Sequence, residues 1–320
     1  MKIVQGDQMP IDEQAGNVRS GRLKKQVFLD GEEGTPGNFR FGLFYQTGDF
    51  YSPRHRHNFD QFRFQIDGDA DFDKNGTMHP DTIGYFPEGA LYGPQTSSGP
   101  NVVAVVQFGG PSGSGYLSQR QVNAAYEEMK KFGVFDKGVY RRNEGVPGRK
   151  NMDSFQATWE YANHRAMVYP KPQYVDPILM NPACFRWMPL PGASGVEVKT
   201  LGTFTDCRIR CARYRVAAGS RLSGKGRGLF LVLSGKGSVE REPMRRYTAA
   251  YLADGDQATF EAEETAEIQL LGLPSESLIG RQPLTADEKT DAARSRSPEQ
   301  VRTRNPLWEG TTDAGASRVV

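Results

Sequence analysis

The chain has 320 residues, and its 40 Lys and Arg against 38 Asp and Glu give a formal net charge of +2 at pH 7. This near-neutral balance gives no electrostatic basis for a nucleic-acid partner. No apolar run approaches the ~18 residues that a membrane span needs. The N-terminal MKIVQGDQMPIDEQ lacks the basic and apolar regions of a signal peptide. We therefore expect a cytoplasmic protein of two domains, or one large one, with no membrane partner.

Side chains suited to metal or acid–base chemistry are scarce. The four histidines are His55, His57, His79 and His164. Three cysteines cannot form a paired disulfide framework. Cys207 and Cys211 lie in the strand-like segment TDCRIRCARYRV, where we expect two buried thiols on one face. A histidine-rich site would therefore have few residues to draw on.

Residues 24–110 are expected to form short strands. The segments KKQVFL, FRFGLFYQT, QFRFQID, TIGYFP and NVVAVVQF are rich in aromatic and β-branched residues and are separated by turn signals such as DGEEGTPGN and DKNG. This pattern favours an antiparallel barrel or sandwich. Phenylalanines at positions 62, 64, 72 and 86 are expected in its core.

A helix is predicted after this first unit, because apolar residues from Val122 to Phe132 recur at helical spacing. Ser118 and Gln121 fit a capping box at its start, and Gly133 is a plausible end. Residues 134–192 are expected to form an irregular connector. Strand-like segments return at 196–273, and a polar tail follows from 284, where Trp308 could act as an anchor.

The most informative stretch is SPRHRHNFDQFRFQIDGDADF. His55 and His57 are two residues apart, so on a strand both rings point to the same face. Gln61 has the same parity, and Gly68 closes the following turn. About twenty residues later comes GYFPEGALYGPQ, which contains Pro-x-Gly-x2-Tyr, ending at Tyr92.

These two motifs resemble those of the cupin superfamily, HxHx3–4Ex6G followed by PxGxxH, over roughly residues 38–110. The resemblance implies a jelly-roll barrel whose interior holds a metal ion on the HxH pair, the glutamate and the last histidine. In this chain Gln61 stands in place of the glutamate, which removes a negative charge and weakens the expected metal binding. Tyr92 stands in place of the last histidine and offers a phenol.

A second, weaker resemblance lies downstream, where GLFLVLSGKG has a turn at Gly235 like that of the first motif. Counted from this glycine, the ligand positions fall on Leu222, Gly224 and Gly228, and the last falls on Ala266. The chain therefore resembles a bicupin whose second barrel has no ligands. The fold class that this implies is all-β, with two cupin-type jelly-roll barrels joined by a helix and a long irregular connector. The expected units are 1–116, 117–192, 193–283 and the tail 284–320.

Three functional hypotheses follow, and the sequence does not choose among them. The first is a metal-dependent enzyme of the dioxygenase, lyase or isomerase class acting on a small organic molecule. In it His55, His57 and Gln61 bind Fe, Mn, Ni or Zn, and Tyr92 and Gln61 take part in catalysis. The second is a non-catalytic protein that binds or senses a small molecule. The third is a metal-free isomerase or epimerase that uses a histidine and Tyr92 as base and acid.

Other polar residues complete the expected site. Gln95 and His164 are predicted to contact the substrate, whereas His79 is expected in a solvated turn. Arg63 is expected to face outward from the strand that carries Gln61. The cupin resemblance also implies a homodimer paired through sheet edges.

Overall fold

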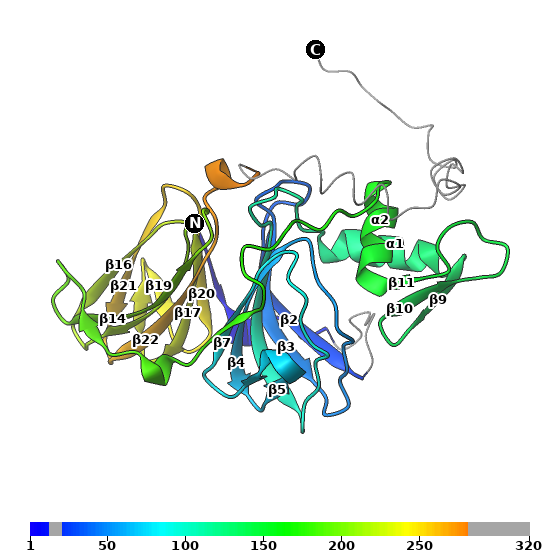
Figure 1. Cartoon of the computed structure of the whole chain (residues 1–320). Helices are drawn as coiled ribbons and strands as arrows, with labels where there is room; N and C mark the ends of the chain where they lie inside the picture. The colour runs from blue at the N-terminus through cyan, green and yellow to red at the C-terminus, as the bar shows by residue number, and fades with distance from the viewer. Residues whose placement is uncertain (13–20, 281–320) are drawn as a thin grey trace, which may run out of the picture.

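The structure is a computed structural model of the chain and describes residues 1–12 and 21–280. Strands predominate among these residues and form two antiparallel β-barrels that lie side by side (Figure 1). The predicted all-β fold of two jelly-roll barrels is thereby confirmed. The predicted polar tail, with Trp308, lies outside the described residues. None of the helices in the described part of the chain is long and apolar enough to cross a bilayer.

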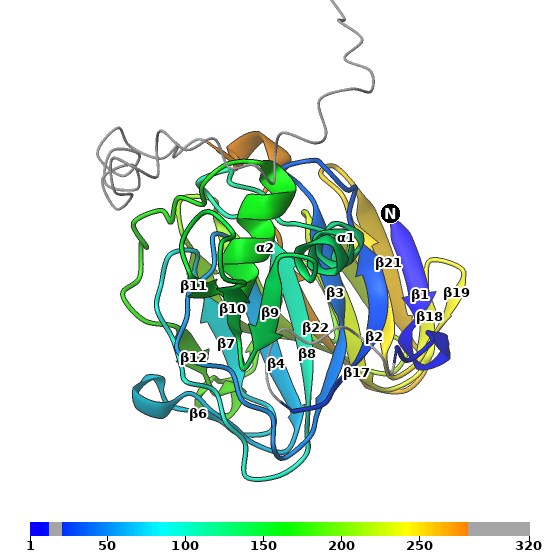
Figure 2. The ribbon, with the colours of Figure 1, turned by 90° about the vertical axis from the view of Figure 1, so that its right-hand side faces the viewer.

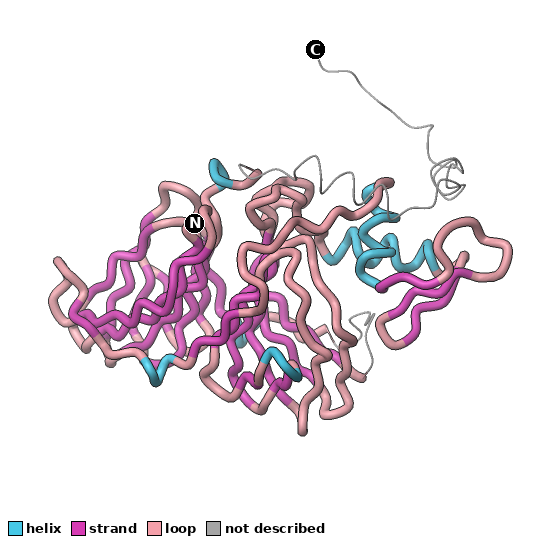
Figure 3. Tube along the Cα trace, in the orientation of Figure 1, coloured by secondary structure: helices cyan, strands magenta, loops and turns pink. Residues whose placement is uncertain are grey.

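The N-terminal barrel is built on an antiparallel sheet with the strand order β12-β7-β4-β8-β3-β2. Its strands are β2 (Leu23–Asp30), β3 (Phe39–Gln46), β4 (Asp60–Asp67), β7 (Ile83–Phe86), β8 (Asn101–Phe108) and β12 (Ile178–Met180). The opposite wall contains the short pair β5 (Ala70–Asp71) and β6 (Thr77–Met78) and single bridges such as Ser52 to Gln95 and His55 to Tyr92. Figure 3 shows how much of this barrel is loop.

The C-terminal barrel has two more regular sheets. The larger one, in the order β1-β20-β17-β22-β15-β14-β13, consists of β1 (Lys2–Gln5), β20 (Thr248–Leu252), β17 (Gly228–Ser234), β22 (Ala266–Gly272), β15 (Ile209–Val216), β14 (Val196–Phe204) and β13 (Met188–Pro189). The smaller one, in the order β16-β21-β18-β19, consists of β16 (Arg221–Lys225), β21 (Gln257–Ala262), β18 (Gly237–Val239) and β19 (Glu242–Met244).

Each barrel is extended by a strand from a distant part of the chain. β1 pairs with β20, so the first residues complete the C-terminal barrel and not the N-terminal barrel with which we expected them. β12, from the connector, pairs with β7 of the N-terminal barrel. Both added strands cover an edge whose N–H and C=O groups would otherwise be unpaired. The chain therefore passes between the two barrels twice, once after β1 and once after β12.

Alternation along the strands determines which barrel face is polar. On β4, Phe62 and Phe64 point toward the other barrel, where the Phe62 ring lies 5.9 Å from that of Phe204. Gln61 and Arg63, on the opposite face of the same strand, point into the N-terminal barrel. The period of two thus places an apolar core between the barrels and polar side chains inside the first one.

The interior of the C-terminal barrel is apolar. Its buried core includes Leu222, Phe230, Phe260 and Ala266. Leu222 and Ala266 are two of the positions that correspond to metal ligands in the motif comparison. Hydrophobic side chains therefore fill the interior of the second barrel, and these two positions are part of that core. Both predicted core thiols are buried, although Cys207 lies in the turn before β15 and only Cys211 lies on the strand.

Two helices and a small sheet lie on the side of the N-terminal barrel that faces away from the C-terminal barrel (Figures 1 and 2). The predicted first helix is α1 (Gln119–Met129), and Ser118 and Gln121 form its capping box. It ends before Gly133, which begins the next strand.

The segment after α1 is more ordered than the irregular connector that we expected. It contains β9 (Gly133–Asp136), β10 (Val139–Arg142), β11 (Asn151–Asp153) and α2 (Ser154–Asn163). Asp153 accepts hydrogen bonds from the N–H groups of Phe155 and Gln156 and so caps α2. The strands have only three or four residues, too few to show a period in the sequence. Four single 3-10 turns complete the described elements: Gly6–Gln8, Asp73–Asn75, Pro182–Cys184 and Glu276–Leu278.

Candidate functional site

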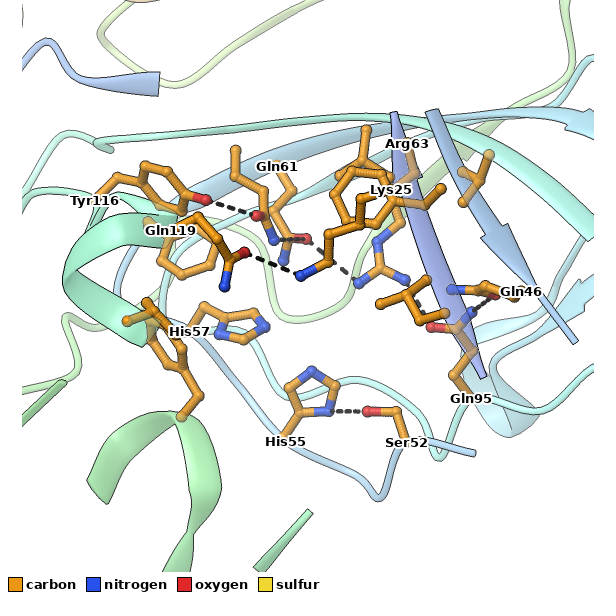
Figure 4. Close-up of a pocket in the computed structure, with 18 of the residues that line it drawn as sticks. Lys25, Gln46, Ser52, His55, His57, Gln61, Arg63, Gln95, Tyr116 and Gln119 are labelled. Atoms are coloured by element: carbon orange, nitrogen blue, oxygen red, sulfur yellow. Dashed lines mark hydrogen bonds between the residues drawn. The ribbon is translucent and has the colours of Figure 1, made fainter. Parts of the chain in front are cut away.

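The N-terminal barrel contains a cavity of about 160 Å³. The cavity is lined by residues of strands β2, β3, β4 and β8. Further lining residues come from the segment 50–59, from Gln95 and from helices α1 and α2. Its polar lining residues are Lys25, Gln46, Ser52, His55, His57, Gln61, Arg63, Gln95, Gln107, Tyr116 and Gln119 (Figure 4). A cavity of roughly 150 Å³ is known to hold a benzene-sized molecule. The site is therefore suited to a small organic ligand.

The two histidines of the HxH motif converge on this cavity. Their ring centroids are 4.8 Å apart, and each residue has only 7% of its surface exposed. The His57 ring stacks on Phe59 at 4.4 Å and meets the edge of Phe155, from α2, at 4.9 Å. These contacts fix the direction of the His57 ring. The common face that the spacing predicts is present, although the segment is held by one bridge to Tyr92 and not by a continuous strand.

Hydrogen bonds determine which nitrogen of His55 carries its proton. Nδ1 lies 2.6 Å from the carbonyl oxygen of Pro53 and 3.3 Å from the Ser52 hydroxyl. Because a carbonyl oxygen only accepts, Nδ1 is the donor, and in the neutral ring Nε2 carries the lone pair. The ring is directed toward the cavity in Figure 4. His55 is therefore oriented as a base.

Arg63 is at the centre of the polar network on the cavity wall. Its guanidinium donates hydrogen bonds to Oε1 of Gln61 at 3.3 Å, to the Tyr92 hydroxyl at 3.1 Å and to Oε1 of Gln95 at 2.8 Å. It also lies over the ring of Phe86, 4.7 Å from its centroid. The expectation that Arg63 faces outward is wrong. Gln61 and Arg63 are two residues apart on β4, so the strand period itself places both on the inner face.

Gln61 is held by three neighbours. Its Nε2 donates to the Tyr92 hydroxyl at 2.9 Å, and its Oε1 accepts from Arg63 and from Nε2 of Gln107 at 3.2 Å. Tyr116 in turn donates to Oε1 of Gln107 at 3.0 Å. The amide oxygen of Gln61 therefore already accepts two hydrogen bonds.

The other predicted site residues lie at different distances from the cavity. Gln95 lines it and links Arg63 to Gln46. Tyr92 is 1% exposed and lies behind Gln61 and Arg63, outside the set of residues that line the cavity. His164 follows the end of α2 in an exposed position and is not brought to the cavity.

Several cavity residues carried no signal in the sequence. Lys25, on β2, donates from Nζ to Oε1 of Gln119 at 2.9 Å, and Gln119 is the first residue of α1. Arg40 donates to the same oxygen at 2.8 Å. Burial, with a further effect from the Arg40 charge, lowers the pKa of Lys25 to about 8. Phe155 enters the site from α2. Only Arg63 could have been found from strand alternation alone.

The donor set does not fit the divalent metal ion that cupin-type motifs imply. His55, His57 and Gln61 are neutral donors, and the charge nearest to Gln61 is the positive guanidinium of Arg63. A dication on these residues would have to displace the hydrogen bonds to the Gln61 oxygen and would lie beside another cation. Within residues 1–12 and 21–280 no group of three or more His, Cys, Asp and Glu is placed to hold a metal.

The charge of the lining is positive. Lys25 and Arg63 line the cavity together with two histidines, and none of the described lining residues is an aspartate or glutamate. The apolar remainder includes Phe44, Val103 and Val105. A largely buried site of this kind favours a small molecule with an anionic group and an apolar part.

No family model and no curated protein matches this chain. Its structure is similar to that of a protein from Nostoc punctiforme provisionally described as a dioxygenase. The TM-score is 0.58 at 9% identity, and the match covers 86% of this chain and 82% of that one.

Oxalate decarboxylase from Bacillus subtilis is similar with a TM-score of 0.47 at 14% identity, over 85% of this chain and 76% of that one. A Pseudomonas aeruginosa protein provisionally described as glyoxylate-induced has a TM-score of 0.46 at 12% identity, over 78% of this chain and 80% of that one. At these identities the likeness concerns the fold. The chain has a two-barrel jelly-roll fold, with a polar cavity in the N-terminal barrel and an apolar core in the C-terminal barrel.

Proposed function

We propose that the N-terminal barrel is a metal-independent site that binds a small organic anion and transfers a proton on it, as an isomerase or epimerase does. The observation that carries this proposal is the position of Arg63. Its guanidinium is fixed in the cavity wall by Gln95 and by Gln61 and Tyr92, which occupy two of the four positions where the motif comparison puts metal ligands. A guanidinium is a permanently charged hydrogen-bond donor that pairs with carboxylates.

The anionic group of the ligand pairs with Arg63 in this account. Arginine stays protonated throughout the physiological pH range, so the site keeps its positive charge. Gln61, Gln95 and Tyr92 hold the guanidinium in place through the three hydrogen bonds already described. Tyr92 is thus a positioning residue, and it receives hydrogen bonds at its oxygen from Gln61 and Arg63.

His55 moves the proton. Its Nδ1 is held by the Pro53 carbonyl, so Nε2 of the neutral ring accepts a proton from the ligand and returns it. The carbonyl contact also stabilises the imidazolium that forms in between, because Nδ1–H remains a donor. His57, which stacks on Phe59 and meets the edge of Phe155, limits the access of water to the ligand.

A metal-dependent enzyme is the second candidate, favoured by the closeness of the two imidazole rings. His55 and His57 would then hold an Fe, Mn, Ni or Zn ion and leave positions open for substrate. The neutral Gln61 and the charge of Arg63 weaken this candidate. A non-catalytic binding protein would share the anion site but transfer no proton.

Binding is tested with pairs of probes that differ only in charge: benzoate with benzamide, and butyrate with butyramide. Thermal shift and calorimetry are measured on the wild type, Arg63→Met, Arg63→Lys and a control, Arg221→Met, on the exposed surface of the C-terminal barrel. We expect each carboxylate to bind the wild type much more tightly than its amide does. In Arg63→Met the carboxylate and the amide should have similar affinities. Equal binding of the amides, or unchanged binding by Arg63→Met, would contradict the anion site.

Proton transfer is tested by following deuterium incorporation from D2O into pyruvate by NMR. The wild type should incorporate deuterium, and His55→Gln should still bind the anion but incorporate none. Binding without incorporation in the wild type would favour the non-catalytic binding protein. Stoichiometric metal in the purified protein that is lost in His55→Ala would favour the metal-dependent enzyme.

A further inference from the structure

We propose that Lys25 is a nucleophilic amine that forms an imine with the carbonyl group of a small ligand in the N-terminal cavity. This rests on the proposed function only for the anionic part of the ligand. The inferred substrate class is then a small oxo acid, with its carboxylate on Arg63 and its carbonyl carbon at Lys25.

The first observation is where the side chain lies. Lys25 is on β2, is 9% exposed and lines the cavity, whereas its neighbour Lys24 faces the outside of the same strand. In Figure 4 the Lys25 nitrogen is directed into the space between Gln119 and Arg63. A ligand in the cavity therefore meets this amine directly.

The second observation is the charge around the amine. The acceptor of its hydrogen bond is the neutral amide of Gln119, and Arg40 donates to the same oxygen at 2.8 Å. Two cations that share one neutral acceptor repel each other, which favours the loss of the proton from lysine. The charge of Asp12, whose backbone bridges to Lys25, and the Phe44 ring at 5.9 Å act in the opposite direction.

Burial and Arg40 prevail over Asp12, since the pKa of Lys25 is lowered to about 8. An ordinary lysine has a pKa of ~10.4, so near pH 8 only a very small share of it is the neutral amine. About half of Lys25 is neutral there. Lysines that are desolvated or next to another cation are the ones that attack carbonyl groups.

The chemistry is a balanced condensation. The amine nitrogen adds to the carbonyl carbon to give a carbinolamine. The carbonyl oxygen then leaves as water with the two hydrogens that the amine nitrogen loses, and a C=N bond replaces C=O. No oxidant or reductant is needed, and hydrolysis reverses the step. The imine nitrogen is more basic than the carbonyl oxygen that it replaces. Once it has taken up a proton, it draws electrons from the neighbouring carbon, which makes a proton there easier for His55 to remove.

The imine is tested by trapping it with sodium cyanoborohydride and locating the adduct by peptide mass spectrometry. The probes are pyruvate, which carries a carboxylate, and butanal, which does not. The variants are Lys25→Met, Lys25→Arg and the control Lys24→Gln on the opposite face of the same strand. At about pH 8 we expect labelling of Lys25 on the order of tenfold faster than of Lys24.

The outcomes separate the two proposals. Both proposals are supported if pyruvate and butanal each label Lys25 and if Arg63→Met slows labelling by pyruvate but not by butanal. Labelling by butanal but not by pyruvate supports the nucleophile and contradicts the anion site. If neither probe labels Lys25 faster than Lys24, the nucleophile is overturned, whatever the carboxylates do in the binding assay. Total labelling of Lys25→Arg at the wild-type rate would also overturn it, because the reactive amine would then be another lysine.

Discussion

The guanidinium of Arg63 lies 3.3 Å from Oε1 of Gln61, two residues earlier on β4. The residue that replaces an anionic metal ligand is therefore joined to a fixed cation. A neutral residue at position 61 and a cation at position 63 are consistent with each other. A glutamate at position 61 would form an ion pair with Arg63, and the positive charge of Arg63 would repel a metal ion. This pair is the basis for the proposed metal-independent site.

The Gln61–Arg63 relationship predicts how a metal site could be restored. Gln61→Glu alone should gain little affinity for Mn²⁺ or Ni²⁺, because Arg63 neutralises the new carboxylate. Gln61→Glu combined with Arg63→Met should bind these ions at least about tenfold more tightly than the single variant, the scale typical of groups next to metal ligands. Calorimetric titration of both variants measures this. Equal affinities in the two variants would show that Arg63 does not oppose metal binding.

A buried carboxyl group predicts a pH dependence of stability. Burial raises the pKa of Asp60 to about 7, although the Glu88 N–H and the Tyr85 hydroxyl donate to it and lower the pKa. Unfolded aspartate has a pKa of ~3.9, so the folded state binds the proton more tightly. The stabilising contribution is fully present below about pH 4 and is lost as the pH rises to about 7.

The measurement is the free energy of unfolding by urea across this pH range. In Asp60→Asn the free energy of unfolding should fall less steeply as the pH rises. In Asp67→Asn, at the exposed other end of β4, it should fall as steeply as in the wild type. A decline of the same slope in Asp60→Asn would assign it to another group. The carboxyl group of Glu88 is the nearby alternative, since Glu88 and Asp60 both lie next to Gly110. A Cβ atom built on Gly110 would be 2.6 Å from the carboxyl carbon of Glu88 and 3.1 Å from the carboxyl carbon of Asp60.

The shared apolar core predicts that the contact between the barrels contributes to the stability of the whole protein. Phe204 of β14 stacks on Tyr85 of β7 at 4.5 Å, and both are buried. Phe204→Ala should cost about 3–5 kcal/mol of unfolding free energy because it leaves a cavity. Phe204→Leu should cost less. If Phe204→Ala costs under ~1 kcal/mol, the contact between the barrels does not contribute as the packing indicates.

The cap of α1 predicts a link between helix stability and the cavity. Ser118 accepts the N–H of Gln121, and Gln119 is the next residue and the partner of Lys25. Ser118→Ala should cost about 1 kcal/mol and slow the labelling of Lys25, since α1 is less firmly placed. Ser118→Thr keeps the cap and is the control. Equal labelling rates in Ser118→Ala and Ser118→Thr would show that the cap of α1 does not affect the reactivity of Lys25.

Local patterns were sufficient for much of the fold. The alternating strands predicted both barrels, and the Ser118–Gln121 pair predicted the start of α1, because each signal lies within a few residues. The addition of β1 to the C-terminal barrel could not be predicted in this way. β1 pairs with β20, more than two hundred residues later, and a strand of four residues has no signal for its partner.

The candidate site was predictable in part for the same reason. The HxH spacing brings His55 and His57 into the cavity, and Gln95 follows from its closeness to Tyr92. Lys25 and Gln119 meet only in the folded chain, 94 residues apart. Arg63 was missed through its assignment to the wrong face, which the period of two corrects. His164 has an exposed position after α2 and is not among the residues that line the cavity.

The most direct test of the metal-independent anion site is a calorimetric titration of the EDTA-treated, metal-free protein. The probes are benzoate and benzamide, with wild type, Arg63→Met and Arg221→Met compared side by side. If the anion site is metal-independent, benzoate binds the metal-free wild type and Arg221→Met equally, and Arg63→Met weakens this binding by at least about tenfold, the scale of a charge-assisted bond. Binding that appears only after Fe, Mn, Ni or Zn is added, or that persists in Arg63→Met, would contradict it.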